Sequence, residues 1–205
     1  MAAAGAPSVL NDPRWKALNT SGFACSCGER HVGLFPIHMH TPVGWPGSKD
    51  YANDDDVRLD GDFLSHNLCV WEGKYFAIRM RLPIQMQGAS PAAFLYTAWA
   101  SLNRPDFEGY LDARRKGHLN KQAKAPARLV NRISGYPETV NLMGVAFQQE
   151  DGGQPLMLVL GQKDDKSESH PLVQEQRNGI GVDRMLELFA VYGHDMRAAA
   201  QAVKA

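Results

Sequence analysis

The chain has 205 residues, of which 44% are hydrophobic and 21% charged, so it is long and apolar enough to fold as one domain around its own core. Its 22 basic and 22 acidic residues cancel, so no overall charge favours nucleic acid or an anionic membrane as a partner. The absence of an apolar run of about 18 residues argues against a membrane span, and three cysteines do not make a disulfide framework. The Ala-rich residues 1–10 lack the features of a signal peptide, so we expect a protein of the reducing cytoplasm.

The first 62 residues show little periodicity. Residues 1–22 have few apolar side chains, and we expect an N-terminal arm that is loose or forms one short helix around Trp15. Residues 23–46 are rich in Gly, Pro, Cys and His, which indicates a loop that a metal could hold in place. Residues 47–62 are rich in Asp, which predicts an exposed loop.

Regular strands are predicted from residue 67 onward. Leu68–Trp71 is a short apolar run, and a Glu-Gly-Lys turn joins it to Tyr75–Gln85, where apolar and charged side chains alternate. Alternation predicts a half-buried antiparallel strand, and the aromatic-rich Ala93–Leu102 predicts its central neighbour. The expected core-facing residues of the alternating strand are Phe76, Ile78, Met80 and Leu82, with Arg79 and Arg81 on the opposite face.

The middle of the chain predicts one helix followed by three strands. Asn103 is placed to cap a helix that Gly117 ends. Ala127–Ser134 is an ambiguous strand, and Thr139–Gln149 with Leu156–Leu160 reads as a hairpin.

Two helices and an Ala-rich tail complete the chain. Ser169, or the adjacent His170, can cap a helix over Pro171–Asn178, and a second helix is predicted from Asp183 to about Tyr192. These elements indicate an α+β fold, with an antiparallel sheet of about five strands and helices packed on one face. The expected organisation is an arm over 1–22, one domain over 23–192 and a tail over 193–205.

Cys25 and Cys27 form, with the following glycine, an almost complete zinc knuckle. A knuckle has two residues between its cysteines, whereas this chain has one, so the local geometry would differ. Two of His31, His38 and His40 are the expected further ligands, while Cys69 belongs to an apolar strand and is expected in the core. Two alternatives stay open, namely reduced thiols in a loop and a cysteine nucleophile with His31 as its base.

The basic stretch 114–132 could contact phosphates, because it contains no acidic residue. It lacks the aromatic side chains on which single-stranded nucleic acids stack. We therefore expect a solvated segment, with no nucleic-acid partner.

Over about residues 23–190 the chain resembles the DUF2199 family of uncharacterised bacterial proteins. The resemblance implies a soluble bacterial protein and does not indicate its chemistry. Members usually have C-x-x-C-G where this chain has one residue fewer between its cysteines. The segments that resemble the family are 23–34, Leu68–Val70 with the hairpin through Arg79, Trp99–Leu102, Asn131–Leu142, and His170–Gln176 leading to Gly179–Ile180.

Two of these segments contribute polar residues that could line a cleft or could tie a helix to the sheet: Asn131, Arg132, Tyr136, His170 and Gln176. The chain has none of the common catalytic motifs. We therefore expect a non-catalytic domain that binds a partner protein, as an antagonist or immunity protein would, or a small ligand, with zinc as a structural metal. The alternative is a small enzyme with a Cys/His or metal centre.

Overall fold

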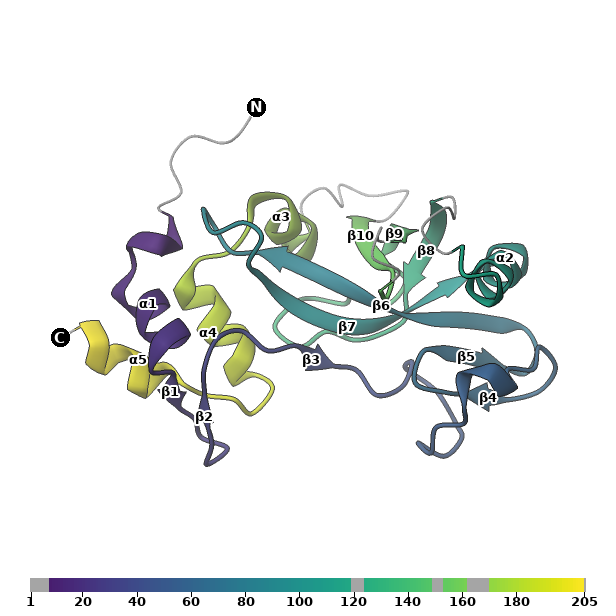
Figure 1. The fold of residues 1–205 in the computed structure, drawn as a ribbon, viewed down its shortest axis with the longest axis horizontal. Coiled ribbons are helices and arrows are strands. Elements are labelled where there is room, and N and C mark those ends of the chain that lie inside the picture. Colours follow the sequence, from purple (N-terminus) through teal and green to yellow (C-terminus); the bar gives the residue numbers. More distant parts are fainter. Residues whose placement is uncertain (1–7, 119–123, 149–152, 162–169, 205) are drawn as a thin grey trace.

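A closed barrel of five strands forms the centre of the computed structural model, which describes residues 8–118, 124–148, 153–161 and 170–204 (Figure 1). The barrel strands are β6 (Tyr75–Gln85), β7 (Ala93–Leu102), β8 (Ala125–Leu129), β9 (Met143–Phe147) and β10 (Leu156–Gly161). Neighbours pair antiparallel around the ring, except that β10 pairs parallel with β6 and so closes it. Closure removes the free edges that an open sheet of these strands would have.

Three short strands extend the barrel into a sheet of eight. β5 (Leu68–Trp71) and β4 (Phe63–Leu64) follow beside β6, and β3 (Ile37–His38) lies parallel beside β7. A separate two-stranded hairpin is formed by β1 (Phe23–Ala24) and β2 (Arg30–His31). The predicted antiparallel sheet of about five strands is therefore wrong: the sheet is mixed and has eight strands, five of them in a barrel. Local alternation could not reveal this, because parallel closure joins segments far apart in the sequence.

The two long strands are confirmed as predicted. β6 and β7 have the expected bounds and pair antiparallel from Phe76 with Leu102 to Gln85 with Ala93. The strand expected over Ala127–Ser134 instead ends at Leu129, because a turn follows it. In this turn the Thr139 hydroxyl donates to the Asn131 carbonyl at 2.7 Å and accepts the Ile133 N–H at 2.9 Å.

The expected core face of β6 is confirmed, but the opposite face is buried as well. The core-facing residues Phe76, Ile78, Met80 and Leu82 are buried, and Arg79 is also only 9% exposed. The segment after β3 covers the second face. Arg79 donates hydrogen bonds to the Met39 and His40 carbonyls at 2.8 and 3.0 Å. Its guanidinium lies over the rings of Tyr51 and Trp99, at 5.5 and 5.1 Å from their centroids. The strand is thus buried on both sides.

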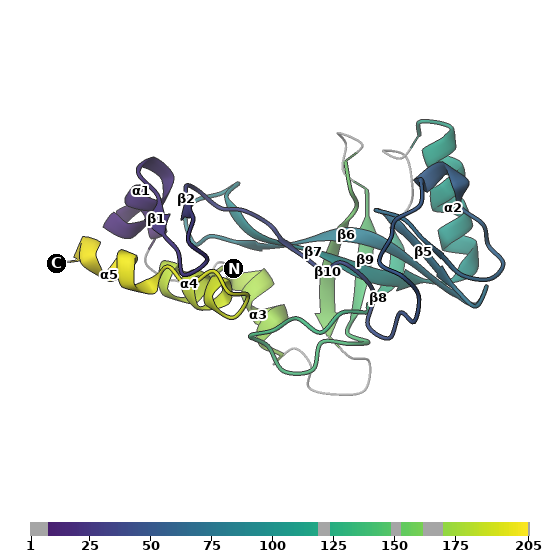
Figure 2. The same ribbon diagram turned by 90° about the horizontal axis from the view of Figure 1, so that it is seen from below.

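The helices lie at two ends of the barrel rather than on one face, which corrects the prediction. α2 (Arg104–Arg115) lies near β5, whereas α1 (Pro13–Thr20), α4 (Val182–Ala190) and α5 (Arg197–Lys204) gather at the far end (Figures 1 and 2). α3 (Pro171–Asn178) packs against β6 and β10, next to the parallel closure of the barrel.

Side-chain caps begin three of these helices, and Asp12 caps α1 by accepting the Arg14 N–H at 2.9 Å. The Asn103 side chain accepts the Asp106 N–H at 2.8 Å, which confirms the predicted start of α2. His170 caps α3, because its Nδ1 accepts the Leu172 N–H at 3.2 Å. Ser169, the other expected cap, lies outside the described residues.

Both ends of the described chain contribute to the core. Val9, Trp15 and Leu18 are buried near the N-terminus, and Met196 and Ala200 are buried near the C-terminus. α1 packs against α5, so the two ends lie together (Figure 1). The domain limits expected from the sequence stay a prediction.

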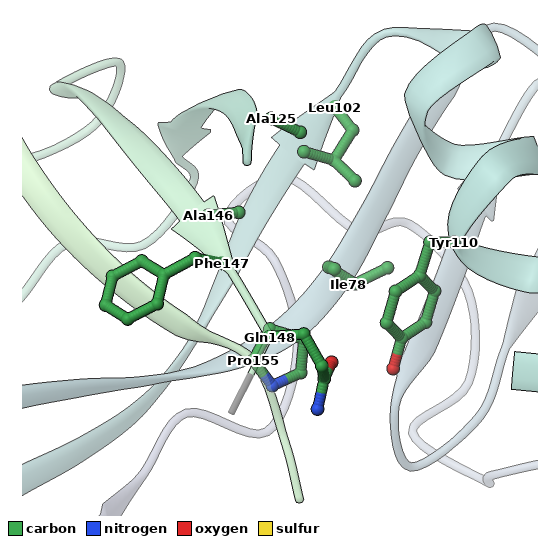
Figure 3. Close-up of a pocket in the computed structure, with 8 residues that line it drawn as sticks. All are labelled: Ile78, Leu102, Tyr110, Ala125, Ala146, Phe147, Gln148 and Pro155. Carbon is green, nitrogen blue, oxygen red and sulfur yellow. The ribbon is translucent and has the colours of Figure 1, made fainter. Parts of the chain in front are cut away.

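The barrel is filled at the end that α2 covers. Figure 3 shows the residues around a small space there, among them Ile78 and Leu102 from the barrel and Tyr110 from α2. Its volume is about 10 Å³, at the lower limit for one water molecule. This part of the barrel is a packed core rather than a ligand cavity.

None of the helices in the described parts of the chain is both long and apolar enough to span a bilayer.

Candidate metal centre

The β1–β2 hairpin carries the two neighbouring cysteines in its turn. Phe23 pairs with His31 across the two strands, which brings His31 close to the turn. The Cys25 N–H donates to the Glu29 carbonyl at 2.9 Å, and the Gly28 N–H donates to the Cys25 carbonyl at 3.0 Å. Gly28 has a φ of 94°, a conformation that residues with a side chain rarely adopt. The turn therefore orders Cys25, Cys27 and His31 within one short segment.

A second segment, the turn after α4, brings His194 to this hairpin. The His194 N–H donates to the Phe189 carbonyl at 3.0 Å, so the end of the helix positions the residue. Ser26 joins the two segments, because its N–H donates to the Asp195 carbonyl at 3.0 Å and its hydroxyl to the Gly193 carbonyl at 3.1 Å. The hairpin turn is therefore hydrogen-bonded directly to the turn that carries His194.

The ligand atoms of Cys25, Cys27, His31 and His194 all lie within 4.8 Å of one another. Cys27 Sγ is 3.2 Å from His31 Nε2, and Cys25 Sγ is 3.9 Å from His194 Nδ1. A tetrahedral zinc ion, with bonds of about 2.3 Å to sulfur and about 2.0–2.1 Å to nitrogen, sets its ligand atoms about 3.3–3.8 Å apart. The observed separations are close to these values, so small side-chain adjustments would complete a Cys₂His₂ site.

An aromatic side chain holds the two imidazoles in place. The Phe35 ring stacks on His31 with centroids 4.4 Å apart and meets His194 edge-on at 5.0 Å. The other side of Phe35 stacks on Phe189 of α4, at 4.3 Å. Packing of this kind restricts the orientations of the two imidazoles before a metal binds. Less conformational entropy is then lost on binding, which favours it.

The surroundings of Cys25 and His194 favour the neutral forms of these two side chains. Burial raises the pKa of the Cys25 thiol above its usual value. Burial and the neighbouring His31 lower the pKa of His194. A neutral imidazole presents a free lone pair, whereas a thiol must lose its proton before it binds a metal. Metal binding at this site would therefore release protons and strengthen as the pH rises.

The structure brings together three of the five predicted metal ligands. His38 lies on β3, where its Nδ1 is 2.6 Å from the Thr97 hydroxyl, and the His40 carbonyl accepts the Tyr51 O–H at 2.6 Å. Neither histidine belongs to the cluster, and His194 takes the place that one of them was expected to fill. Cys69 is buried in β5, as expected, and burial raises its pKa to about 12.

Two of the five predicted polar residues hold backbone segments together. Asn131 is buried, accepts the Trp99 N–H at 2.6 Å and donates to the Thr41 carbonyl at 2.8 Å. Gln176 of α3 accepts the Val159 N–H at 2.8 Å and donates to the Pro83 carbonyl at 3.1 Å. It thus bonds to β10 and β6 at once, where the two strands close the barrel.

The other three residues make separate contacts. The Arg132 side chain is 74% exposed and pairs with Glu138 at 3.2 Å. His170 caps α3. The Tyr136 hydroxyl donates to Glu175, which accepts the Arg184 Nε–H at 2.7 Å, so the Gly-Tyr-Pro turn contacts α3 and α4. This Tyr136–Glu175–Arg184 contact was not predicted, because neither Glu175 nor Arg184 stood out in the sequence.

The described part of the basic stretch 114–132 is partly neutralised by ion pairs. Arg114 pairs with Asp54 at 2.7 Å and Lys116 with Asp112 at 2.8 Å. These pairs reduce the positive charge available to a phosphate backbone.

Replacement of Asn131 and of Arg132 is expected to have opposite consequences. Asn131→Ala should lower the free energy of unfolding by about 2–4 kcal/mol, because it removes the partners of the buried Trp99 N–H and the part-buried Thr41 carbonyl. Arg132→Ala should change it by less than about 1 kcal/mol, because the Arg132–Glu138 ion pair is exposed. Urea unfolding of both variants measures the difference. Equal losses would contradict the roles that these contacts indicate.

One family model matches the chain. Residues 24–180 match the family described as "Uncharacterized protein conserved in bacteria (DUF2199)", which confirms the resemblance seen in the sequence. The matched segment includes Cys25, Cys27 and His31 and ends before His194. No curated protein and no solved structure matches the chain.

Proposed function

The chain belongs to the DUF2199 family of uncharacterised bacterial proteins, and we propose that it is a non-catalytic binding domain stabilised by one structural metal ion. Zinc is the metal that the ligand set favours, since two thiolates and two imidazoles form a common tetrahedral zinc site. The proposed ligands are Cys25, Cys27, His31 and His194.

A single observation carries this proposal: four soft ligand atoms from two distant segments lie within 4.8 Å of one another. Cys25 and His194 are 169 residues apart in the sequence. A site with four protein ligands leaves no coordination position for a substrate, as is typical of structural rather than catalytic zinc.

The metal would hold the ends of the fold together. The hairpin that carries the cysteines follows α1, and His194 precedes α5, which packs against α1. A metal bond across these segments would stabilise the folded state, because the unfolded chain does not preform the site. The three cysteines are unpaired, which suits a reducing compartment such as the cytoplasm.

The alternative is a small enzyme that uses a cysteine–histidine pair, and one observation favours it. Cys27 is exposed, and its Sγ lies 3.2 Å from His31 Nε2, a separation at which an imidazole could accept the thiol proton. The two functions differ in thiol reactivity. A catalytic Cys27 would react quickly with iodoacetamide in the protein as purified, whereas a metal-bound Cys27 would react only after a chelator is added.

Elemental analysis of the protein purified without a tag tests the proposal. We expect about one zinc per chain in the wild type and a large loss of zinc in His194→Ala, because three ligands hold the metal much more weakly than four. His38→Ala is the matched control and should retain the metal, since His38 lies outside the cluster. A metal-free wild type, or equal zinc in His194→Ala and the wild type, would refute the proposal.

A further inference from the structure

A second cavity lies at the other end of the molecule from the metal centre. It has a volume of about 360 Å³, within the usual range for small-molecule sites. Its walls come from the segment 42–45, the β5–β6 hairpin, the outward faces of β7 and β8, and residues 140–141. Figures 1 and 2 both show β2 and the β5–β6 hairpin at opposite ends of the long axis.

Aromatic and aliphatic side chains form much of this cavity, and two of them are exposed. Trp45, Trp71 and Tyr75 line it, and the Trp71 and Tyr75 rings are 5.4 Å apart at an angle of 41°. Tyr75 is 59% exposed and Val43 is 42% exposed, although both are large apolar residues. Aromatic surface left open to water in a concave site indicates a ligand with a flat, apolar body.

One cation lines the cavity without a carboxylate partner. Arg128 lies on β8, where exposed and buried residues alternate, and it is paired in register with Ser101 of β7, which also lines the cavity. Within the described parts of the chain, Arg128 makes no ion pair, whereas Arg114 and Arg132 each pair with an acid. A free guanidinium beside an apolar wall favours a ligand with one anionic group.

We propose that this cavity binds a small amphipathic anion, a molecule with a flat apolar body and one carboxylate or sulfonate group. The body lies against Trp45, Trp71 and Tyr75, and the anionic group bonds to Arg128. A cationic ligand is disfavoured because Arg128 would repel it, although the aromatic walls alone would suit one.

The inference gives a ligand class to the binding function proposed above and rests on it. The two can still fail separately, because the cavity and the metal centre lie at opposite ends of the molecule and have different readouts. Loss of zinc tests the metal centre, and ligand affinity tests the cavity.

Two related fluorescent compounds are suitable probes. 8-Anilino-1-naphthalenesulfonate has a flat aromatic body and a sulfonate, and N-phenyl-1-naphthylamine has the same ring system without the charge. We expect the sulfonate to bind the folded wild type with one site per chain and at least about tenfold more tightly than the neutral compound, because only the sulfonate makes a charge-assisted hydrogen bond. Fluorescence titration gives the affinities, and calorimetry gives the stoichiometry of the sulfonate.

Three variants test the roles of the walls and the cation. Arg128→Gln should remove the preference for the sulfonate, while Arg132→Gln, the matched control outside the cavity, should retain it. Tyr75→Ala should weaken both probes, and its exposed position leaves folding intact. Equal affinity of the wild type for the two probes, an unchanged preference in Arg128→Gln, or unchanged binding in Tyr75→Ala would overturn the inference.

Discussion

Chelation of the metal is expected to lower the melting temperature of the wild-type protein by about 8–16 °C. A ligand present at about 1,000 times its dissociation constant stabilises the folded state by about 4 kcal/mol, and each 1 kcal/mol corresponds to about 2–4 °C for a chain of this size. The physical reason is the separation of the ligands, since Cys25 and His194 are 169 residues apart and meet only in the folded chain. Differential scanning calorimetry with and without a chelator measures the shift.

Two variants make this result specific to the cluster. The Cys25→Ser, Cys27→Ser double variant should melt at a lower temperature than the metal-bound wild type and should not respond to the chelator. His38→Ala should respond as the wild type does, because His38 contacts Thr97 rather than the cluster. If chelation removed the zinc but left the melting temperature of the wild type unchanged, the metal would have no structural role.

Truncation of Trp99 is expected to lower the free energy of unfolding by about 3–5 kcal/mol. Trp99 is fully buried, and its Nε1–H donates to the Met39 and His40 carbonyls at 3.1 and 3.2 Å. Its ring also faces the Arg79 guanidinium at 5.1 Å, so Trp99→Ala would leave a cavity beside a buried cation. The loss arises on the face of the sheet opposite the predicted core face of β6, where Trp99 packs with Leu64, Cys69 and Ala77.

Urea unfolding followed by far-ultraviolet circular dichroism measures this loss without depending on tryptophan fluorescence. Leu158→Ala is the control, because Leu158 lies on barrel strand β10 but is 43% exposed, and it should change the stability by less than about 1 kcal/mol. A loss below about 1 kcal/mol in Trp99→Ala would show that the segment after β3 does not form a packed layer over β6 and β7.

Local patterns in the sequence predicted the elements that depend on neighbouring residues. Alternation located β6 and β7, and the Asn103 cap located the start of α2. The side chains of Phe76, Ile78, Met80 and Leu82 face the core as their spacing predicts. These features are local, because strand alternation and helix caps are determined within a few residues.

The features that the sequence did not predict depend on contacts between distant segments. Parallel pairing of β10 with β6 closes the barrel, and no local pattern indicates which strands close a ring. Arg79 was expected at the surface because a charged residue alternated with apolar ones, but the segment after β3 covers it and supplies its hydrogen-bond acceptors. A buried cation of this kind cannot be distinguished from an exposed one by periodicity.

The metal centre was predicted only in part, because three of its ligands are close in the sequence and the fourth is far away. Cys25, Cys27 and His31 lie in one short segment, so their spacing gave a signal. His194 is one of seven histidines and follows a helix far along the chain, and only its position after Gly193 at the end of that helix sets it apart. His38 and His40 were favoured over it because they are closer in sequence to the cysteines.

X-ray absorption spectroscopy at the zinc edge tests the four-ligand metal centre most directly. The wild-type protein should show two sulfur ligands at about 2.3 Å and two nitrogen ligands at about 2.0–2.1 Å. His194→Ala, loaded with zinc, should retain both sulfur ligands and lose one imidazole. A wild-type site with a single sulfur ligand, or an imidazole count that is the same in His194→Ala, would contradict a centre built from Cys25, Cys27, His31 and His194.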